Sequence, residues 1–257
     1  GDMNEEYSVK TPYRTKAFYN VFTMERNAKD VMGIFEGLAK ESAAECMDDY
    51  RSLCQKIGMA PRFDEIRVLR YEELVEYAKE KFGLDYVNRL IRDTLMDPDR
   101  DVRDKSFHIV DILLLNCQEL TPGIILLFAP PYYPEVNSSQ DSFIEECVAH
   151  VTQDARERFD LELEQVHFFN GISDLSYVNY RDTSSGWVSY ENNTPVYGDL
   201  YNIPFQTMQE LNAPVLNIGP FGKDPHKRTE RLHMKNAFEE VPEIIASLIL
   251  HMAEQTD

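Results

Sequence analysis

His226 and Glu230 are the residues whose types and spacing most directly suggest chemistry. They stand four positions apart in NIGPFGKDPHKRTERL, residues 217–232. Gly219 and Gly222 let the backbone turn sharply, and the prolines beside them stiffen it. A stiff turn suits a metal ligand, because coordination geometry must be held closely, and imidazole is a common ligand of zinc. We expect Glu230 to accept a hydrogen bond from the second ring nitrogen or to orient the loop, whereas a plain surface histidine is the alternative.

The rest of the sequence offers few competing sites. The other five histidines lie apart, and no HExxH, HxH or CxxC pattern occurs. In GISDL, residues 171–175, the fifth position is Leu175, whereas a serine nucleophile elbow needs glycine there. Cys46 and Cys54 stand eight apart on one expected helix, too far to bridge. The four cysteines are therefore expected to be reduced thiols.

Charge and hydropathy exclude several classes of partner. The 257 residues include 45 acidic and 26 basic side chains, which gives a formal charge of −19. Such an acidic chain is a poor match for nucleic acid or an anionic membrane surface. No apolar run approaches the roughly 20 residues that span a bilayer, and GDMNEEYSVK at residues 1–10 does not resemble a signal peptide. We expect a cytoplasmic location.

The first half of the chain alternates strand and helix patterns. The pattern predicts strands at 16–25, 64–70 and 124–130, and helices at 28–57, 71–82, 85–96 and about 100–119. Asn27 is the expected N-cap of the first helix, and Gly58 its stop. The helices should therefore position the strand ends within one compact α/β or α+β unit.

The second half repeats this alternation after a break. The prolines of residues 130–138 rule out regular structure and mark the expected domain boundary. The pattern then predicts helices at 140–158, 205–212 and 238–255, strands at 164–169 and 214–218, a turn at 171–178 and a loop over 178–203. This order is typical of an α/β fold class with two domains, 14–130 and 138–257. His226 would then follow the carboxyl end of the strand at 214–218, where α/β folds bind their ligands.

Two motifs resemble a known enzyme family. GPFGKDPHKRTERL resembles the C-terminal signature of the di-zinc metallopeptidases of the carboxypeptidase G and succinyl-diaminopimelate desuccinylase type, and GISDLSYV resembles their G-G-[ST]-D segment. TPYRTKAFYNVFTMERNAKDV and FAPPYYPEV extend the resemblance toward a protein of arginine utilisation, so it covers most of the chain. The resemblance implies that 14–130 is a lid and dimerisation domain and 138–257 the C-terminal part of the catalytic domain.

The same resemblance implies roles for individual residues. His226 would be the ligand of one of two zinc ions, and Ser173, Asp174, Gly219, Gly222 and Glu230 would lie near the substrate. The implied activity is metal-assisted hydrolysis of an amide or peptide bond in a small amino-acid derivative. The implied partner is a second copy of the chain, bound through the lid.

The chain departs from the family in one respect. The family's HxD pair, bridging Asp, Glu-Glu pair and general base have no counterpart, because His108 and Asp111 form HxxD in the wrong domain. One imidazole cannot hold zinc, which takes four ligands. We therefore expect a C-terminal half that is inactive alone and binds no stoichiometric zinc. A stand-alone, non-catalytic dimerisation or ligand-binding protein is the alternative, and a serine hydrolase is a third possibility weakened by the missing elbow.

Overall fold

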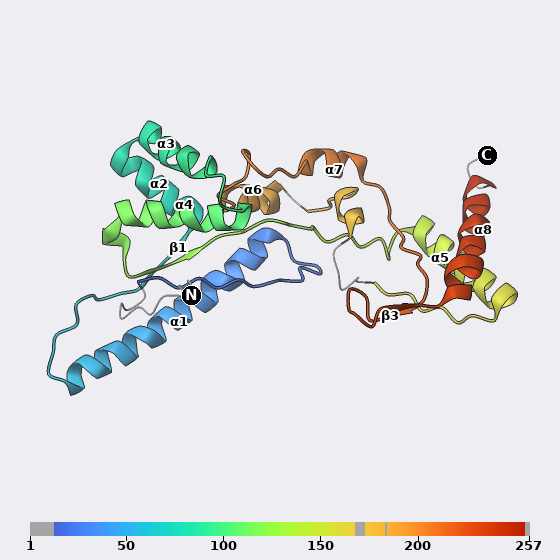
Figure 1. The fold of residues 1–257 in the computed structure, drawn as a ribbon, viewed down its shortest axis with the longest axis horizontal. Helices are drawn as coiled ribbons and strands as arrows, with labels where there is room; N and C mark the ends of the chain where they lie inside the picture. The colour runs from blue at the N-terminus through green and yellow to red at the C-terminus, as the bar shows by residue number, and fades with distance from the viewer. Residues whose placement is uncertain (1–12, 168–172, 183, 255–257) are drawn as a thin grey trace.

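The computed structural model describes residues 13–167, 173–182 and 184–254. It is elongated, with α1 to α4 at one end and α5, α8 and a small hairpin at the other (Figure 1). Helices dominate, and the sheets of the described residues contain two strands each. This mixture of helices and small sheets is compatible with the expected α/β class. Among the described residues no helix is long and apolar enough to cross a membrane.

Helix α1, Ala28–Lys56, begins and ends where the sequence predicts. The Asn27 side chain accepts a hydrogen bond from the backbone N–H of Asp30, and the Asp30 carboxylate accepts one from the N–H of Asn27. This reciprocal capping satisfies two N–H groups that an uncapped helix leaves unpaired. Gly58 follows the helix with a φ of 69°, a left-handed conformation that glycine adopts easily.

A parallel β-α-β unit forms the core of the first half. Strand β1, Arg67–Arg70, pairs in parallel with β2, Gly123–Leu126, so that Val68 lies opposite Ile124. The crossover between them consists of α2 (Tyr71–Phe82), α3 (Leu84–Leu95) and α4 (Val102–Asn116). Its helices bury an apolar cluster that includes Leu74, Val87, Ile109 and Leu113. The strands and helices expected between residues 64 and 130 are thus confirmed, apart from small differences in their ends.

An aromatic cluster joins residues 177–211 to the start of α1. Helices α6 (Ser184–Asn192) and α7 (Phe205–Leu211) contribute Tyr190, Phe205 and Met208 to a core that also contains Ala28 and Tyr180. The helix at 205–212 was predicted, but the loop prediction over 178–203 was wrong, because α6 forms within it. Its sequence, SSGWVSYEN, has no clear helical period, so tertiary burial of Trp187 and Tyr190 decides the structure.

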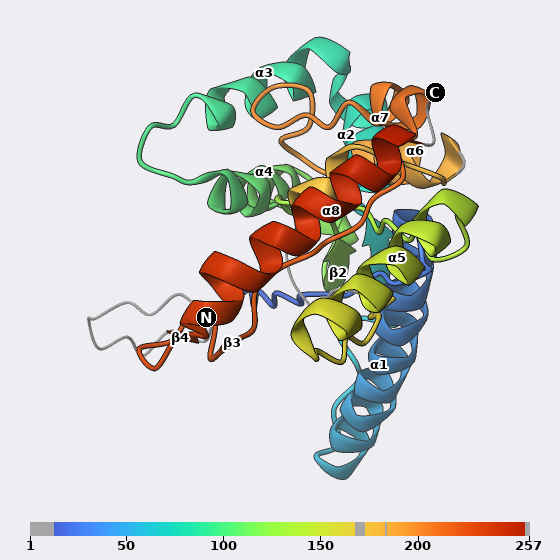
Figure 2. The same ribbon diagram turned by 90° about the vertical axis from the view of Figure 1, so that its right-hand side faces the viewer.

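Two helices form the other end of the molecule. Helix α5 (Ser142–Phe159) packs beside α8 (Val241–Glu254), which continues from a π-helical turn at Asn236–Glu240 (Figure 2). Their contact buries Cys147, Val151, Ala155, Ile244 and Leu248. Both helices were predicted. Cys147 and the other cysteines, Cys46, Cys54 and Cys117, are free thiols.

Three predicted strands are absent from the described chain. Residues 16–23, 164–166 and 214–218 have no regular structure, although each carries a β-type sequence. Residues 168 and 169, the end of the second predicted strand, lie outside the described residues. A strand is defined by its hydrogen-bonded neighbour, and within the described chain none of these segments has one.

The hydrophobic cores show which segments pack together. Tyr180, Tyr190 and Phe205 share a cluster with Ala28, and Val196 packs into the core of the β-α-β unit. Residues 177–211 therefore pack with the first expected domain, 14–130, rather than with α5 and α8. The division at 130–138 and the assignment of 14–130 as a lid stay predictions.

Candidate functional site

His226 lies at the tip of a small β-hairpin. Strand β3, Gly222–Lys223, pairs in antiparallel fashion with β4, Arg231–Leu232, and His226 lies in the exposed loop between them. Its φ of 62° is left-handed, which is uncommon for a residue with a side chain. Gly222 allows a close approach of the two strands, because a Cβ there would lie 3.0 Å from the carbonyl oxygen of Arg231. The hairpin thus replaces the expected turn after a sheet strand.

The Glu230 carboxylate holds this loop in shape. Its Oε2 accepts a hydrogen bond from the backbone N–H of His226 at 3.2 Å. The guanidinium of Arg231 lies 3.2 Å from the Asp224 carboxylate across the same loop. Of the two roles considered for Glu230, orienting the loop is the one this contact fits. His226 itself is exposed to solvent.

The second predicted site segment forms a separate element. Ser173 begins a short 3₁₀ helix, Asp174–Tyr177, and its Oγ accepts a long 3.4 Å hydrogen bond from the N–H of Leu175. Asp174 is exposed. Gly171 and Ile172 lie outside the described residues. Within the described chain, no hydrogen bond or ion pair joins this helix to the hairpin, so the substrate-binding roles of Ser173 and Asp174 stay predictions.

The donor groups near His226 do not by themselves fit a zinc ion. Among the described residues, no group of three His, Cys, Asp or Glu side chains could hold a metal. Glu230 is engaged by a backbone N–H, and Gly219 and Gly222 bring no side-chain donor. Zinc takes four ligands, of which a catalytic site supplies three from protein. A zinc site that used His226 would therefore need ligands beyond those described here.

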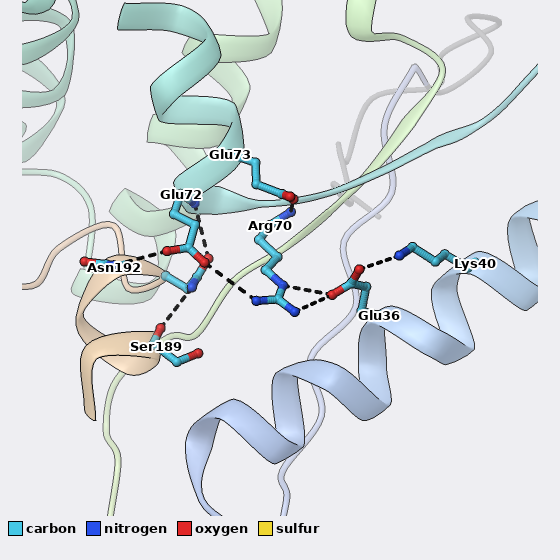
Figure 3. Close-up of polar contacts among 8 residues, drawn as sticks. Glu36, Lys40, Arg70, Glu72, Glu73, Ser189 and Asn192 are labelled. Carbon is cyan, nitrogen blue, oxygen red and sulfur yellow. Dashed lines mark hydrogen bonds and ion pairs between the residues drawn. The ribbon is translucent and has the colours of Figure 1, made fainter. Parts of the chain in front are cut away.

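Sequence reasoning missed a polar network centred on Arg70 (Figure 3). Arg70 ends β1, and its Nε and Nη2 both donate to Glu36 Oε2 on α1, at 2.8 and 2.6 Å. Lys40 also donates to the Glu36 carboxylate. Hydrogen bonds from Lys40 and Arg70 hold the pKa of Glu36 below its usual value, and the bond to Glu36 raises the pKa of Arg70. These charges fasten α1 to the strand.

The same network continues into α6. The N–H of Glu72 donates to Asn193 Oδ1 at 3.2 Å, and Asn192 Nδ2 donates to the Glu72 carboxylate at 3.1 Å (Figure 3). Asn193, which is fully buried, in turn donates to the carbonyl oxygen of Ser189. The polar groups of this network hydrogen-bond to one another. We therefore interpret the network as a structural contact that holds α1, α2 and α6 together.

A carboxyl group with unusual surroundings lies beyond β2. Glu135 Oε2 is shielded from solvent and has no hydrogen-bond partner among the described residues, and the same holds for the hydroxyl of Tyr132. Burial, together with the charges of Asp182 and Asp30, raises the pKa of Glu135 to about 7. Asp182 itself accepts hydrogen bonds from Asn27 Nδ2 and from the hydroxyl of Tyr180, both at 3.0 Å.

Glu135 is thus a candidate proton donor or acceptor. Its segment follows β2, at the carboxyl end of the parallel strand pair, and the start of α1 lies close to it through Asp30. A carboxyl group that titrates near neutrality can exchange a proton at physiological pH. Glu135 lies in the proline-rich segment at 130–138. In the sequence it was marked only by its place in the motif YYPE after a predicted buried strand.

A histidine pair marks a third polar site, between α5 and α8. The rings of His150 and His251 stack at 4.1 Å, and His150 Nε2 lies 3.0 Å from Ser247 Oγ. Glu146 Oε1 lies 3.7 Å from His251 Nε2. His150, Ser247 and His251 border an open hollow of about 430 Å³. These groups lie on different elements from the predicted site.

The chain is homologous to two proteins of Bacillus subtilis (strain 168). It is 34% identical to the uncharacterized protein YqjN over 261 residues, which covers 100% of this chain and 47% of YqjN. It is 26% identical to protein RocB over 267 residues, covering 98% of this chain and 46% of RocB. No family model matches the chain, and no solved structure matches it significantly. The chain therefore spans about half the length of the curated relatives it matches.

Proposed function

We propose that this chain is the C-terminal half of a zinc-dependent metallopeptidase or amidohydrolase related to RocB. In the complete enzyme His226 is one zinc ligand, and the substrate is an amide or peptide of a small amino acid, in keeping with a role in arginine utilisation. The observation that carries the proposal is the hairpin, which presents His226 at an exposed, glycine-shaped tip held by Glu230.

Three further observations support the proposal. The similarity to RocB and YqjN extends over almost the whole chain but about half of each relative. The loop geometry is fixed by groups other than the imidazole, so the ring remains available to a ligand. The described donors do not complete a zinc site, so the proposal requires that the missing ligands and the general base come from a polypeptide corresponding to the unmatched half of the relatives. No catalytic residue is assigned within this chain.

The first experiment determines whether a catalytic half precedes this one. The gene is sequenced upstream of Asp2 and the complete reading frame is expressed. An in-phase segment with an HxD pair and a Glu-Glu pair supports the proposal. A native start at Met3 instead selects the stand-alone, non-catalytic alternative.

A substitution at His226 then tests its role in the complete protein. We expect His226→Ala to remove about one of two bound zinc ions and to lower kcat/KM for N-acyl amino acids or dipeptides at least ~100-fold, as loss of a metal ligand should. Lys227→Ala, at the neighbouring exposed position, is the matched control and should keep both. Elemental analysis and a hydrolysis assay measure the two effects. Tight binding of one zinc per chain by residues 1–257 alone would contradict the proposal.

A further inference from the structure

Two extended segments lie against α5 and α8 without forming a sheet. Residues 161–166, LELEQV, leave the end of α5, and residues 213–219, APVLNIG, lead from α7 toward the hairpin (Figure 1). Leu161 from the first segment and Leu216 and Ile218 from the second pack against the core of the two helices. Extended segments that pack on helices through such apolar side chains resemble the sheet and helix layers of an α/β arrangement.

The backbone of these segments is open to pairing. Within the described chain, no backbone–backbone hydrogen bond involves residues 162–166 or 214–219. The N–H of Val215 is bound by the hydroxyl of Ser138, and neighbouring Ser139 contacts His167, so both segments are held near the same turn. The other N–H groups of the two segments, from 162–166 and 216–218, have no backbone acceptor among the described residues. Such an extended β-type segment is a template for an added strand.

The side chains beside this backbone are also incompletely covered. Val166 is 73% exposed, and Leu163 is exposed as well. Phe221 and Leu232, in the hairpin that continues the second segment, are exposed too. Apolar side chains that are exposed beside unpaired extended segments indicate a surface that binds another polypeptide.

We propose that residues 162–166 and 214–218 are sheet strands whose neighbours are strands of a polypeptide corresponding to the half of YqjN and RocB that this chain does not match. The choice of partner rests on the proposed function and on the coverage of 47% and 46% of these relatives. Pairing along 214–218 fixes the segment that leads directly into Gly219 and the hairpin, and so positions His226 against the partner's ligands.

The experiment uses the unmatched part of YqjN as the probe. A tagged version of this chain is co-expressed with that part of YqjN, and the purified material is analysed for stoichiometry and for amide hydrogen exchange. We expect the two polypeptides to purify together in equal amounts. We expect exchange at the amides of residues 162–166 and 216–218 to slow at least ~100-fold relative to the isolated chain, because paired strand amides are protected. Pro214 has no amide N–H, and that of Val215 already donates to Ser138.

Two variants with matched controls locate the contact. Asn217→Pro removes the backbone N–H of an exposed residue in the second segment, and Asn20→Pro does the same at an exposed residue elsewhere. Val166→Asp places a charge at an exposed apolar position of the first segment, and Met96→Asp does so at the equally exposed end of α3. The first of each pair should weaken co-purification at least ~10-fold, whereas its control should not. Thermal melting of the isolated variants checks that Val166→Asp folds like Met96→Asp.

Each other outcome overturns the proposal. Failure of the wild-type chain to co-purify, a complex without new protection at both segments, or equal binding by Val166→Asp and Met96→Asp would show that these segments are not paired by the partner. The proposed function fails separately. If the complex protects both segments but binds no zinc and hydrolyses no substrate, the proposal of strand pairing stands and the proposed enzymatic function is rejected.

Discussion

At the scale of single residues, Glu135 shows how the surroundings of a side chain, and not only its residue type, determine its pKa. Asp182 and Asp30, distant in sequence, share its surroundings, and burial raises the pKa of its carboxyl group to about 7. Its Oε2 has no hydrogen-bond partner in the described structure. An acid whose pKa is higher in the folded than in the unfolded protein binds its proton more tightly when folded. The folded state should therefore lose stability as this proton leaves.

This argument predicts a pH dependence of stability. Between pH 4.5 and about 7 the unfolded chain loses the Glu135 proton while the folded chain keeps it, so the free energy of unfolding should fall as the pH rises. Glu135→Gln should remove this decrease and stabilise the protein at pH 8 by about 1 to 3 kcal/mol, allowing for partial solvent screening. Urea unfolding at several pH values measures the effect. Glu164→Gln, at an exposed position, serves as the control and should leave the slope unchanged.

His226 and Glu230 show what spacing alone reveals about a site. Their types and separation were visible in the sequence, as were the turn glycines that shape the loop. The hydrogen bond from the His226 backbone to Glu230 was not, because it depends on the left-handed φ of His226 within the hairpin. Glu135 gave no comparable signal, since the charge of Asp182 reaches it from 47 positions along the chain.

At the scale of elements, the parallel pair β1–β2 depends on a close approach at Gly123. A Cβ at this position would lie 2.8 Å from the carbonyl oxygen of Leu120 and 3.5 Å from that of Arg67. Both atoms are backbone, so neither can move aside without disturbing the first residue pair of the strands. Gly37, on the exposed face of α1, differs, because a Cβ there would meet no other atom within 4 Å.

These two glycines should respond oppositely to alanine. Gly123→Ala should lower the free energy of unfolding by about 1 to 3 kcal/mol, because the strand pair must shift. Gly37→Ala should raise it by about 0.5 to 1 kcal/mol, because alanine restricts the unfolded chain and favours a helix interior. Denaturant titration of both variants beside the wild type measures this. A loss of stability at Gly37 would contradict the open environment of that position.

Elements marked by nearby capping or turn residues were predictable from the sequence. Elements that depend on contacts with residues distant in the sequence were not. Asn27 and Asp30 mark the start of α1, and Gly83, with a φ of 86°, separates α2 from α3. The predicted strands at 16–25 and 214–218 carry similar β-type sequences to β1, but only β1 finds a partner within the described chain. Helix α6 was missed because its burial depends on tertiary contacts, such as those of Tyr190 with Phe128 and Tyr132, which precede it by 62 and 58 positions.

At the scale of the whole molecule, the predicted homodimer remains a proposal that the surface makes testable. Residues 14–22 run along the body, where Phe18 lies against Phe107 and Tyr19 against Phe35. Phe22 extends beyond them and is 62% exposed. Apolar side chains along an open segment suit contact with a second copy through the range 14–130.

Sedimentation at micromolar concentration should therefore show a dimer. Phe22→Asp should shift the population toward monomer by at least ~10-fold in dissociation constant, because a charge would enter the apolar contact. Leu211→Asp, at a similarly exposed position outside 14–130, should leave the mass unchanged. A clean monomer for the wild-type protein would reject the dimer.

The cap of α1 has a consequence for how the chain is made. Asn27 completes the first helix and also donates to Asp182, which lies 155 positions later. Ala28, beside it, is buried by Tyr180 and Phe205. On a ribosome adding 5 to 20 residues per second, these partners emerge roughly 8 to 35 s after the cap. Helix α1 therefore stays without these contacts in the nascent chain for that time, and a chaperone has time to bind its uncovered end.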